Sequence, residues 1–222
     1  MSAAREEILA RIRVALADVP RAERAEDVVV ARDYLVREPE GTVARFLERV
    51  AEYGATVRVV PPAAARAAVA EACRELGVRR LAVPSDLPSD WLPDGVEVVA
   101  DAGLPARELD EIGAALTGCA LGIAETGTIV LDGGRSQGRR VLTLVPDAHI
   151  CVVAGDQVVD GVPAALRRLA GVLRSQRRPL TLVSGPSATA DIEFSRVEGV
   201  HGPRRLAVIV TSPSFETASE SI

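Results

Sequence analysis

The chain has 222 residues, a formal net charge of −5 and a hydrophobic fraction of 48%. This length supports one well-formed core with a small appendage. The acidic balance, and the lack of a basic segment interleaved with aromatic residues, argue against nucleic acid as a partner. The sequence contains arginine but no lysine, which excludes a Schiff-base lysine and the lysine of a P-loop.

The cysteines Cys73, Cys119 and Cys151 are far apart and form no C-x-x-C pair. Such a pattern predicts buried apolar side chains and not a zinc or iron–sulfur site. No cofactor motif stands out, so we expect neither a metal nor another cofactor. The sequence shows no signal peptide and no apolar run of 18 residues, so we expect a cytoplasmic protein with no membrane partner.

Residues 2–17 have the spacing of an amphipathic helix, with Ile8, Ile12 and Leu16 on one stripe. The polar, charged stretch that follows, 18–41, separates this helix from the rest of the chain. An apolar stripe needs a cover. We therefore expect the helix to pack on the main domain or across a homodimer.

The remaining chain alternates helical and strand-like segments, which predicts an α/β fold with a mainly parallel sheet flanked by helices. From residue 108 on, strands follow one another through short loops, which indicates a mixed or antiparallel section. The predicted organisation is an N-terminal helix and linker (1–41), one α/β domain (42–212) and a polar tail (213–222).

Each predicted element has a recognisable pattern of apolar residues and breakers. We predict helices over 42–53, 61–77, 106–116 and 162–174. We predict strands over 55–60, 79–84, 95–101, 121–125, 127–132, 139–146, 149–155, 179–185 and 204–212.

The segment GGRSQG (133–138) has the composition of a phosphate-binding loop. Nucleotide-binding loops of this kind lead into a helix N-terminus, whereas the segment after this loop is predicted as a strand. A hairpin loop is therefore the favoured interpretation. Arg135 and Arg139 could still close over an anionic ligand.

The segment SGPSATADIE (184–193) is the better candidate for an anion site. It follows a strand, Gly185 allows a tight turn, and Ser187 or Thr189 could cap a helix that starts there. Free backbone N–H groups at such a start attract phosphate or carboxylate. The alternative is an ordinary strand-to-helix turn with a serine cap.

The two histidines lie in VPDAHICVV and VEGVHGPRR. His201, between two glycines, could carry a proton or bind a ligand at neutral pH. Alternatively its side chain bonds a local carbonyl and fixes the loop. His149 allows the same two interpretations.

Glu125 stands between the apolar runs LGIA and TIVL, with Thr126, Gly127 and Thr128 following it. It is either a carboxylate neutralised at a strand end, or a nucleophile or general base whose pKa is raised by apolar neighbours. In open α/β sheets, ligands gather beyond the carboxyl ends of the strands.

We therefore expect one shared cleft. Its predicted acid–base residues are Glu125, His201 and Asp191. Its predicted ligand-binding residues are Thr126, Gly127, Thr128, Gly185, Ser187, Thr189 and Arg135.

Four segments together resemble the signature regions of the LUD domain family, and specifically its lactate utilisation protein C group. They are GIAETGTIVL, VPDAHICVV, SGPSATADIE and GVHGPRRLAVIV, and the leading EEILARIRVAL is also typical. The resemblance implies the fold group of glucosamine-6-phosphate deaminase, ribose-5-phosphate isomerase and CoA transferases. CoA transferases of this group use a glutamate two residues before a glycine, a spacing that Glu125 and Gly127 share.

The resemblance also implies a component of a bacterial system that oxidises L-lactate to pyruvate, beside an iron–sulfur subunit and a cysteine-rich subunit. In that interpretation the chain binds a small carboxylate or a phosphorylated metabolite, or organises its partners, and electron transfer belongs to the partners. The alternative is a self-sufficient sugar-phosphate or acyl-transfer enzyme that uses Glu125 as nucleophile or base. A third interpretation is a metabolite sensor without chemistry.

Overall fold

A computed structural model describes residues 3–20, 22–24, 27, 29, 42–176, 178–186, 188–190, 196–198 and 201–213. The chain divides into two compact units, Met1–Leu35 and Val36–Ile222. In the first unit, helix α1 (Ala3–Ala15) has no buried residue. Ile8, Ile12 and Leu16 are all exposed, so what covers this stripe stays a prediction.

The second unit is built on a six-stranded sheet in which every neighbouring pair is parallel. The strands, in their order across the sheet, are β1 (Thr56–Val60), β12 (Arg205–Thr211), β7 (Ala148–Ala154), β4 (Ala114–Thr117), β2 (Arg80–Pro84) and β3 (Glu97–Asp101). The central strands are continuous buried runs, as expected of parallel strands covered on both faces. The predicted α/β class with a mainly parallel sheet is confirmed.

A smaller mixed sheet confirms the predicted antiparallel section. Its strands, in order, are β8 (Val158–Val159), β5 (Leu121–Ile123), β6 (Thr128–Leu131) and β9 (Thr181–Val183). Strand β6 is antiparallel to both of its neighbours, while β5 and β8 are parallel. A separate antiparallel pair joins β10 (Ala188–Ala190) and β11 (Arg196–Glu198).

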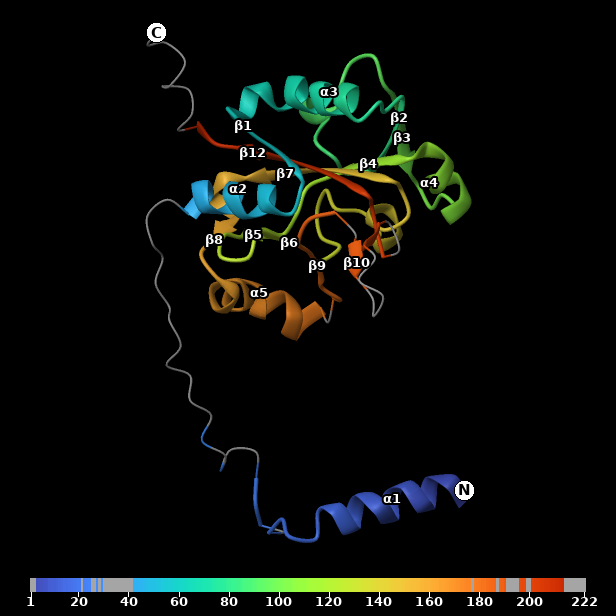
Figure 1. Cartoon of the computed structure of the whole chain (residues 1–222), viewed down its shortest axis with the longest axis vertical. Coiled ribbons are helices and arrows are strands. Elements are labelled where there is room, and N and C mark those ends of the chain that lie inside the picture. Colours follow the sequence, from blue (N-terminus) through green and yellow to red (C-terminus); the bar gives the residue numbers. More distant parts are fainter. Residues whose placement is uncertain are drawn as a thin grey trace. The chain divides into compact units, whose positions relative to one another are not determined.

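The helices of this unit cover the sheets in layers (Figure 1). They are α2 (Thr42–Glu52), α3 (Ala65–Glu75), α4 (Ala106–Ile112) and α5 (Val162–Gln176), with short 3₁₀ helices η2 (Pro62–Ala64), η3 (Ser89–Trp91), η4 (Arg140–Thr143) and η5 (Gly155–Gln157). Helix α3 packs on one face of the large sheet. Helix α2 and the small sheet pack on the other, and α5 covers the outer face of the small sheet.

Glycines let α2 approach the small sheet closely. A β-carbon at Gly127 would lie 2.7 Å from the carbonyl carbon of Arg49, and one at Gly122 would lie 3.0 Å from the Phe46 ring. Gly127 also has a φ of 58°, a conformation that favours glycine. The glycines of GIAETG therefore have a packing role, because any larger residue would push the helix away.

One predicted helix is too long. Helix α4 ends at Ile112 and is followed by Gly113, which has the left-handed C-cap conformation and donates its N–H to Leu109 O. The next residues, predicted to stay helical, form β4 between β7 and β2. Ala114 and Ala115 have a high helical propensity, but strand pairing in the buried centre of the sheet outweighs it.

Two further elements differ from the prediction. The predicted strand 139–146 contains η4, in which Leu142 is buried against α4 with Val141 and Val145 beside it. That spacing is helical, not alternating. The predicted helix start after Gly185 is also wrong, because Ala188–Ala190 forms strand β10. The described residues of this segment, 184–186 and 188–190, therefore offer no helix N-terminus to an anion.

Candidate functional site

The large sheet has a reversal point at β2 and β4. These strands are neighbours, but the chain leads from β2 to β3 on one side and from β4 to β7 on the other. Ligands of open α/β sheets bind beyond the carboxyl ends of the strands at such a point. Asp86 follows β2, Asp101 ends β3 and Gly118 follows β4.

The loop 133–138 lies over this point and is held by a buried carboxylate. Asp132 has 6% of its surface exposed and Gln137 has 4%. The Gly134 N–H and the Gln137 Nε2 donate to Asp132 Oδ1 at 2.9 and 2.8 Å, and the Asp132 N–H donates to Gln137 Oε1 at 2.8 Å. A β-carbon at Gly134 would lie 2.7 Å from Asp132 Oδ1, so this closure needs glycine there.

The middle of the loop is held from the other side. Ser136 has a φ of 60°, an uncommon conformation for a residue with a side chain. Its N–H donates to Asp86 Oδ2 at 2.8 Å, and its carbonyl accepts the Gly118 N–H at 2.7 Å. Two strand ends of the large sheet therefore fix the strained residue in place.

The structure rules out both interpretations of GGRSQG. The loop leads into η4 and does not join paired strands, so it is not a hairpin loop. It is not an amide cradle for phosphate either, because the N–H groups of Gly134, Ser136 and Gln137 already have acceptors within the protein. A ligand here would be recognised mainly by side chains.

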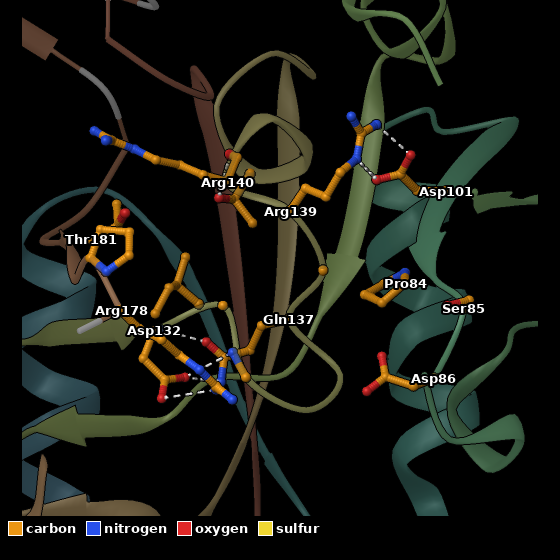
Figure 2. A pocket seen from close by; sticks show the side chains of 16 residues that line it. Pro84, Ser85, Asp86, Asp101, Asp132, Gln137, Arg139, Arg140, Arg178 and Thr181 are labelled. Atoms are coloured by element: carbon orange, nitrogen blue, oxygen red, sulfur yellow. Dashed lines mark hydrogen bonds and ion pairs between the residues drawn. The ribbon is translucent and has the colours of Figure 1, made fainter. Parts of the chain in front are cut away.

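On one side of the loop lies a cavity of about 540 Å³, which we call the β3-side cavity (Figure 2). Arg139 forms one wall of it by pairing with Asp101 through two bonds of 2.9 and 2.5 Å. The Asp101 side chain is only 1% exposed. The Arg139 guanidinium, helped by the N–H groups of Gly103 and Leu104, holds the pKa of that carboxyl below its usual value.

The β3-side cavity is also lined by Arg140, Arg178, Thr143 and Thr181. Figure 2 shows Arg178 beside Asp132 and Gln137, away from the Arg139–Asp101 pair. Arg178 Nη1 lies 3.7 Å from Asp132 Oδ2, too far for a hydrogen bond. The Arg140 side chain has no hydrogen bond or ion pair within the described part of the chain, so its charge is available to a ligand.

The other side of the loop borders a cavity of about 420 Å³, the α5-side cavity. It contains the sequence-predicted Arg135 and shares Asp132, Gly134, Gln137 and Arg178 with the first cavity. Cys119 also lines it. A hydrogen bond with Cys151, together with burial, raises the pKa of Cys119, so it is a neutral thiol at pH 7 and a poor nucleophile.

A third cavity, of about 230 Å³, brings both histidines together with Ser184 and Gly185. The predicted neighbours Thr126 and Thr128 reach it through a chain of hydroxyl groups. Thr126 Oγ1 lies 2.6 Å from Thr128 Oγ1, which lies 2.8 Å from Ser184 Oγ. Two of the predicted residues, Gly185 and His201, therefore line this histidine cavity, and Thr126 and Thr128 are connected to it through Ser184.

His149 is the buried member of the pair. It is 1% exposed, and its Nε2 lies 2.8 Å from Thr117 Oγ1. Burial lowers the pKa of His149 to about 4, so the ring is neutral at physiological pH. The His149 side chain therefore lines the cavity as an uncharged polar group and not as a cation.

Glu125 lies elsewhere, on the turn that joins β5 to β6. It is exposed, and its N–H donates to Asp160 O at 2.8 Å. Its Oε2 lies 2.8 Å from where a β-carbon would stand on Gly161, the residue before α5. A carboxylate near a helix N-terminus is favourable. Glu125 is not among the residues that line the three cavities, and its catalytic role stays a prediction.

The other predicted site residues are placed as follows. Gly127 is covered by α2. Thr189 lies on β10, where only the backbone is described. Ser187 and Asp191 lie outside the described residues, so the complete four-residue cleft also remains a prediction.

Sequence reasoning missed most of the residues that form the two cavities beside the loop. Asp86 and Asp101 carried a usable signal, because each is the first acid at the end of a predicted parallel strand, in LAVPSD and VEVVAD. Arg140 and Arg178 carried no such signal, since arginines are frequent in this chain.

Within the described ranges, no group of three or more His, Cys, Asp or Glu side chains could hold a metal ion. None of the helices there has the length and apolar character of a membrane span.

The fold and the cavities define an α/β protein with candidate ligand sites at the reversal point of a parallel sheet. The model of the LUD domain family matches residues 43–211, and the chain belongs to this family. A protein from Deinococcus radiodurans named lactate utilization protein C is 50% identical over 167 residues, 75% of this chain and 77% of that protein.

A lactate utilization protein C from a Geobacillus species is 30% identical over 145 residues, 62% of this chain and 58% of that protein. A crystal structure of a DUF162 family protein from Deinococcus radiodurans has a TM-score of 0.67 and 42% identity, and it covers 77% of this chain and 96% of that chain. The family resemblance inferred from the four sequence segments is confirmed.

Proposed function

We propose that this protein acts in lactate utilisation and binds a small 2-hydroxy or 2-oxo carboxylate, such as L-lactate or pyruvate, in the β3-side cavity. The names of its relatives supply the metabolic context. The observation that carries the site is Arg140, a guanidinium at the mouth of the cavity that has no partner among the described residues.

Three arginines and three aspartates line the β3-side cavity, so a monoanion would be recognised by Arg140 itself and not by a net positive charge. Asp101 is neutralised by Arg139, and Asp86 accepts the Ser136 N–H. Arg178 stands near Asp132, so Arg140 provides the one cationic group without an acid beside it among the described lining residues. An arginine binds a carboxylate with two parallel N–H donors.

The polar groups of the cavity also suit the second functional group of such a ligand. Thr143 and Thr181 line the cavity together with Arg140. The Thr181 hydroxyl can donate to the oxygen at C2 of pyruvate or accept from the hydroxyl of lactate. Thr143 Oγ1 already donates to Arg140 O at 3.2 Å, so it can only accept from the hydroxyl of lactate. At about 540 Å³ the cavity has room for the ligand together with water. We place electron transfer on iron–sulfur and cysteine-rich partner subunits.

Calorimetric titration of the purified protein with L-lactate and with pyruvate tests this proposal. We expect Arg140→Gln to weaken binding about tenfold, the effect of losing one charged hydrogen-bonding partner. Arg107→Gln is the matched control, because Arg107 pairs with Glu111 on the exposed face of α4 and does not line the cavity. It should bind like the wild type.

The proposal fails if the folded wild type binds neither acid at millimolar concentration. It also fails if Arg140→Gln and Arg107→Gln bind as tightly as the wild type. Acetate separates the contributions of the two functional groups, because it keeps the carboxylate and lacks the oxygen at C2. Acetate should bind more weakly than lactate.

A further inference from the structure

The α5-side cavity has a different electrostatic character from its neighbour. Arg135 comes from the loop, Arg168 from α5, and Arg178 from the segment after α5. Asp132 is the single acid among the lining residues. Three arginines against one aspartate leave two positive charges in excess, so the cavity favours an anion with at least two negative charges.

The three guanidinium groups keep most of their donors for a ligand. Arg135 has no side-chain partner among the described residues. Arg168 donates one Nη1 bond to Asp156 O at 2.9 Å, which leaves its other N–H groups. Arg178 approaches Asp132 only at 3.7 Å. Arginines from three separate segments that face one space are an arrangement suited to phosphate oxygens.

The wall of the cavity also contains a flat aromatic surface. Trp91 of η3 lines it, half-buried. Its six-membered ring borders the start of the Gly118–Cys119 segment, since a β-carbon at Gly118 would lie 3.5 Å from Trp91 Cζ3. Aromatic side chains of this kind stack on planar rings such as nucleobases. A volume of about 420 Å³ lies within the range of cavities that hold ligands of that size.

We infer that the α5-side cavity is a second binding site, for a phosphate-bearing ligand with a planar ring, of the nucleoside diphosphate class. Arg135, Arg168 and Arg178 bind the phosphates and Trp91 contacts the ring. This inference depends on the lining of the α5-side cavity and not on lactate binding, so either proposal can fail while the other stands.

The test is a titration of the purified full chain with ADP and with inorganic pyrophosphate at fixed ionic strength. We expect both to bind, ADP more tightly. Arg135→Gln should weaken both about tenfold, and Arg140→Gln, which alters only the β3-side cavity, should leave both within twofold of the wild type. Trp91→Leu should remove the preference for ADP. Melting curves of each variant confirm that it is folded.

Three results would overturn the inference. The first is no binding of either probe by the folded wild type. The second is equal weakening by Arg135→Gln and Arg140→Gln, which would indicate attraction by the general surface charge. The third is an unchanged preference for ADP in Trp91→Leu, which would remove the ring contact from the site.

Discussion

Asp132 and Gln137 bind each other in both directions across the loop 133–138. The Asp132 N–H donates to Gln137 Oε1, and Gln137 Nε2 donates to Asp132 Oδ1, both at 2.8 Å. Both residues are almost completely buried. This pair closes the loop between the two cavities, so it positions Arg135 on one side and Arg140 on the other.

Truncating this pair should destabilise the protein. Gln137→Ala leaves the Asp132 N–H without its acceptor and removes one donor from a buried carboxylate. Each such loss costs about 1–3 kcal/mol, so we expect a decrease of about 3 kcal/mol in the free energy of unfolding, measured by urea denaturation. Ser175→Ala removes an exposed hydroxyl that bonds Gly171 O and serves as the control. Equal stability of the two variants would contradict the role given to Gln137.

His149 should make the protein sensitive to mild acid. Its pKa is about 4 in the fold and 6.5 as the reference value, so the unfolded chain takes up the proton first. The free energy of unfolding should therefore be highest above pH 6.5 and fall by about 3 kcal/mol as the pH is lowered to 4.

A glutamine at this position isolates the effect. His149→Gln keeps a polar partner for Thr117 and does not titrate, so its stability should change less over the same range. Urea denaturation of both proteins at pH 7, 5.5 and 4.5 provides the comparison. Parallel curves for the two proteins would show that His149 does not carry the acid sensitivity.

Arg139 should be the residue that keeps Asp101 ionised. Arg139→Gln should raise the pKa of Asp101 and lower the free energy of unfolding at pH 7 by about 1–2 kcal/mol, because a buried carboxylate loses its cation. Because the pKa of Asp101 is lowered in the fold, this group stabilises the wild type above pH 3.8, its reference pKa. The difference in the free energy of unfolding between wild type and Arg139→Gln should therefore shrink below about pH 4.

Carboxyl NMR titration of Asp101 and urea denaturation measure these two effects. Arg80→Gln is the control, since Arg80 pairs with Glu97 on the surface and surface pairs contribute about 0–1 kcal/mol. An unchanged titration of Asp101 in Arg139→Gln would refute the assignment.

Glu125→Gln separates the two interpretations of that acid. From its place beside Gly161 at the start of α5, we expect a loss of about 0.5 kcal/mol of stability from the helix dipole and no change in lactate affinity. Glu48→Gln, on the exposed side of α2, is the control. Loss of growth on lactate by a folded Glu125→Gln variant would instead support the catalytic role predicted from the sequence.

Parts of the fold were predictable because their patterns are local. The buried runs of β7 and β12 and the amphipathic α3 follow directly from the order of apolar residues. Strand β4 was missed because its alanines favour a helix, and only pairing with β7 and β2 makes it a strand. The segment at η4 was predicted wrongly because, over so short a length, its apolar residues fit both the helical period and the two-residue alternation of a strand.

Fewer residues of the candidate site could be predicted from the sequence. Arg135 and the turn at Gly185 were chosen from local motifs, and each lines a cavity. The placement of Arg178 beside Asp132 depends on how β9 returns to pair with β6. No short segment encodes that contact, because it joins residues far apart in the chain.

The most direct test of the central proposal is a crystal structure of the protein soaked with L-lactate. We predict electron density for lactate in the β3-side cavity, with its carboxylate paired to Arg140 and its hydroxyl within hydrogen-bond distance of Thr143 or Thr181. Lactate bound at Glu125 or in the histidine cavity, or a β3-side cavity that stays empty at saturating lactate, would contradict the proposal.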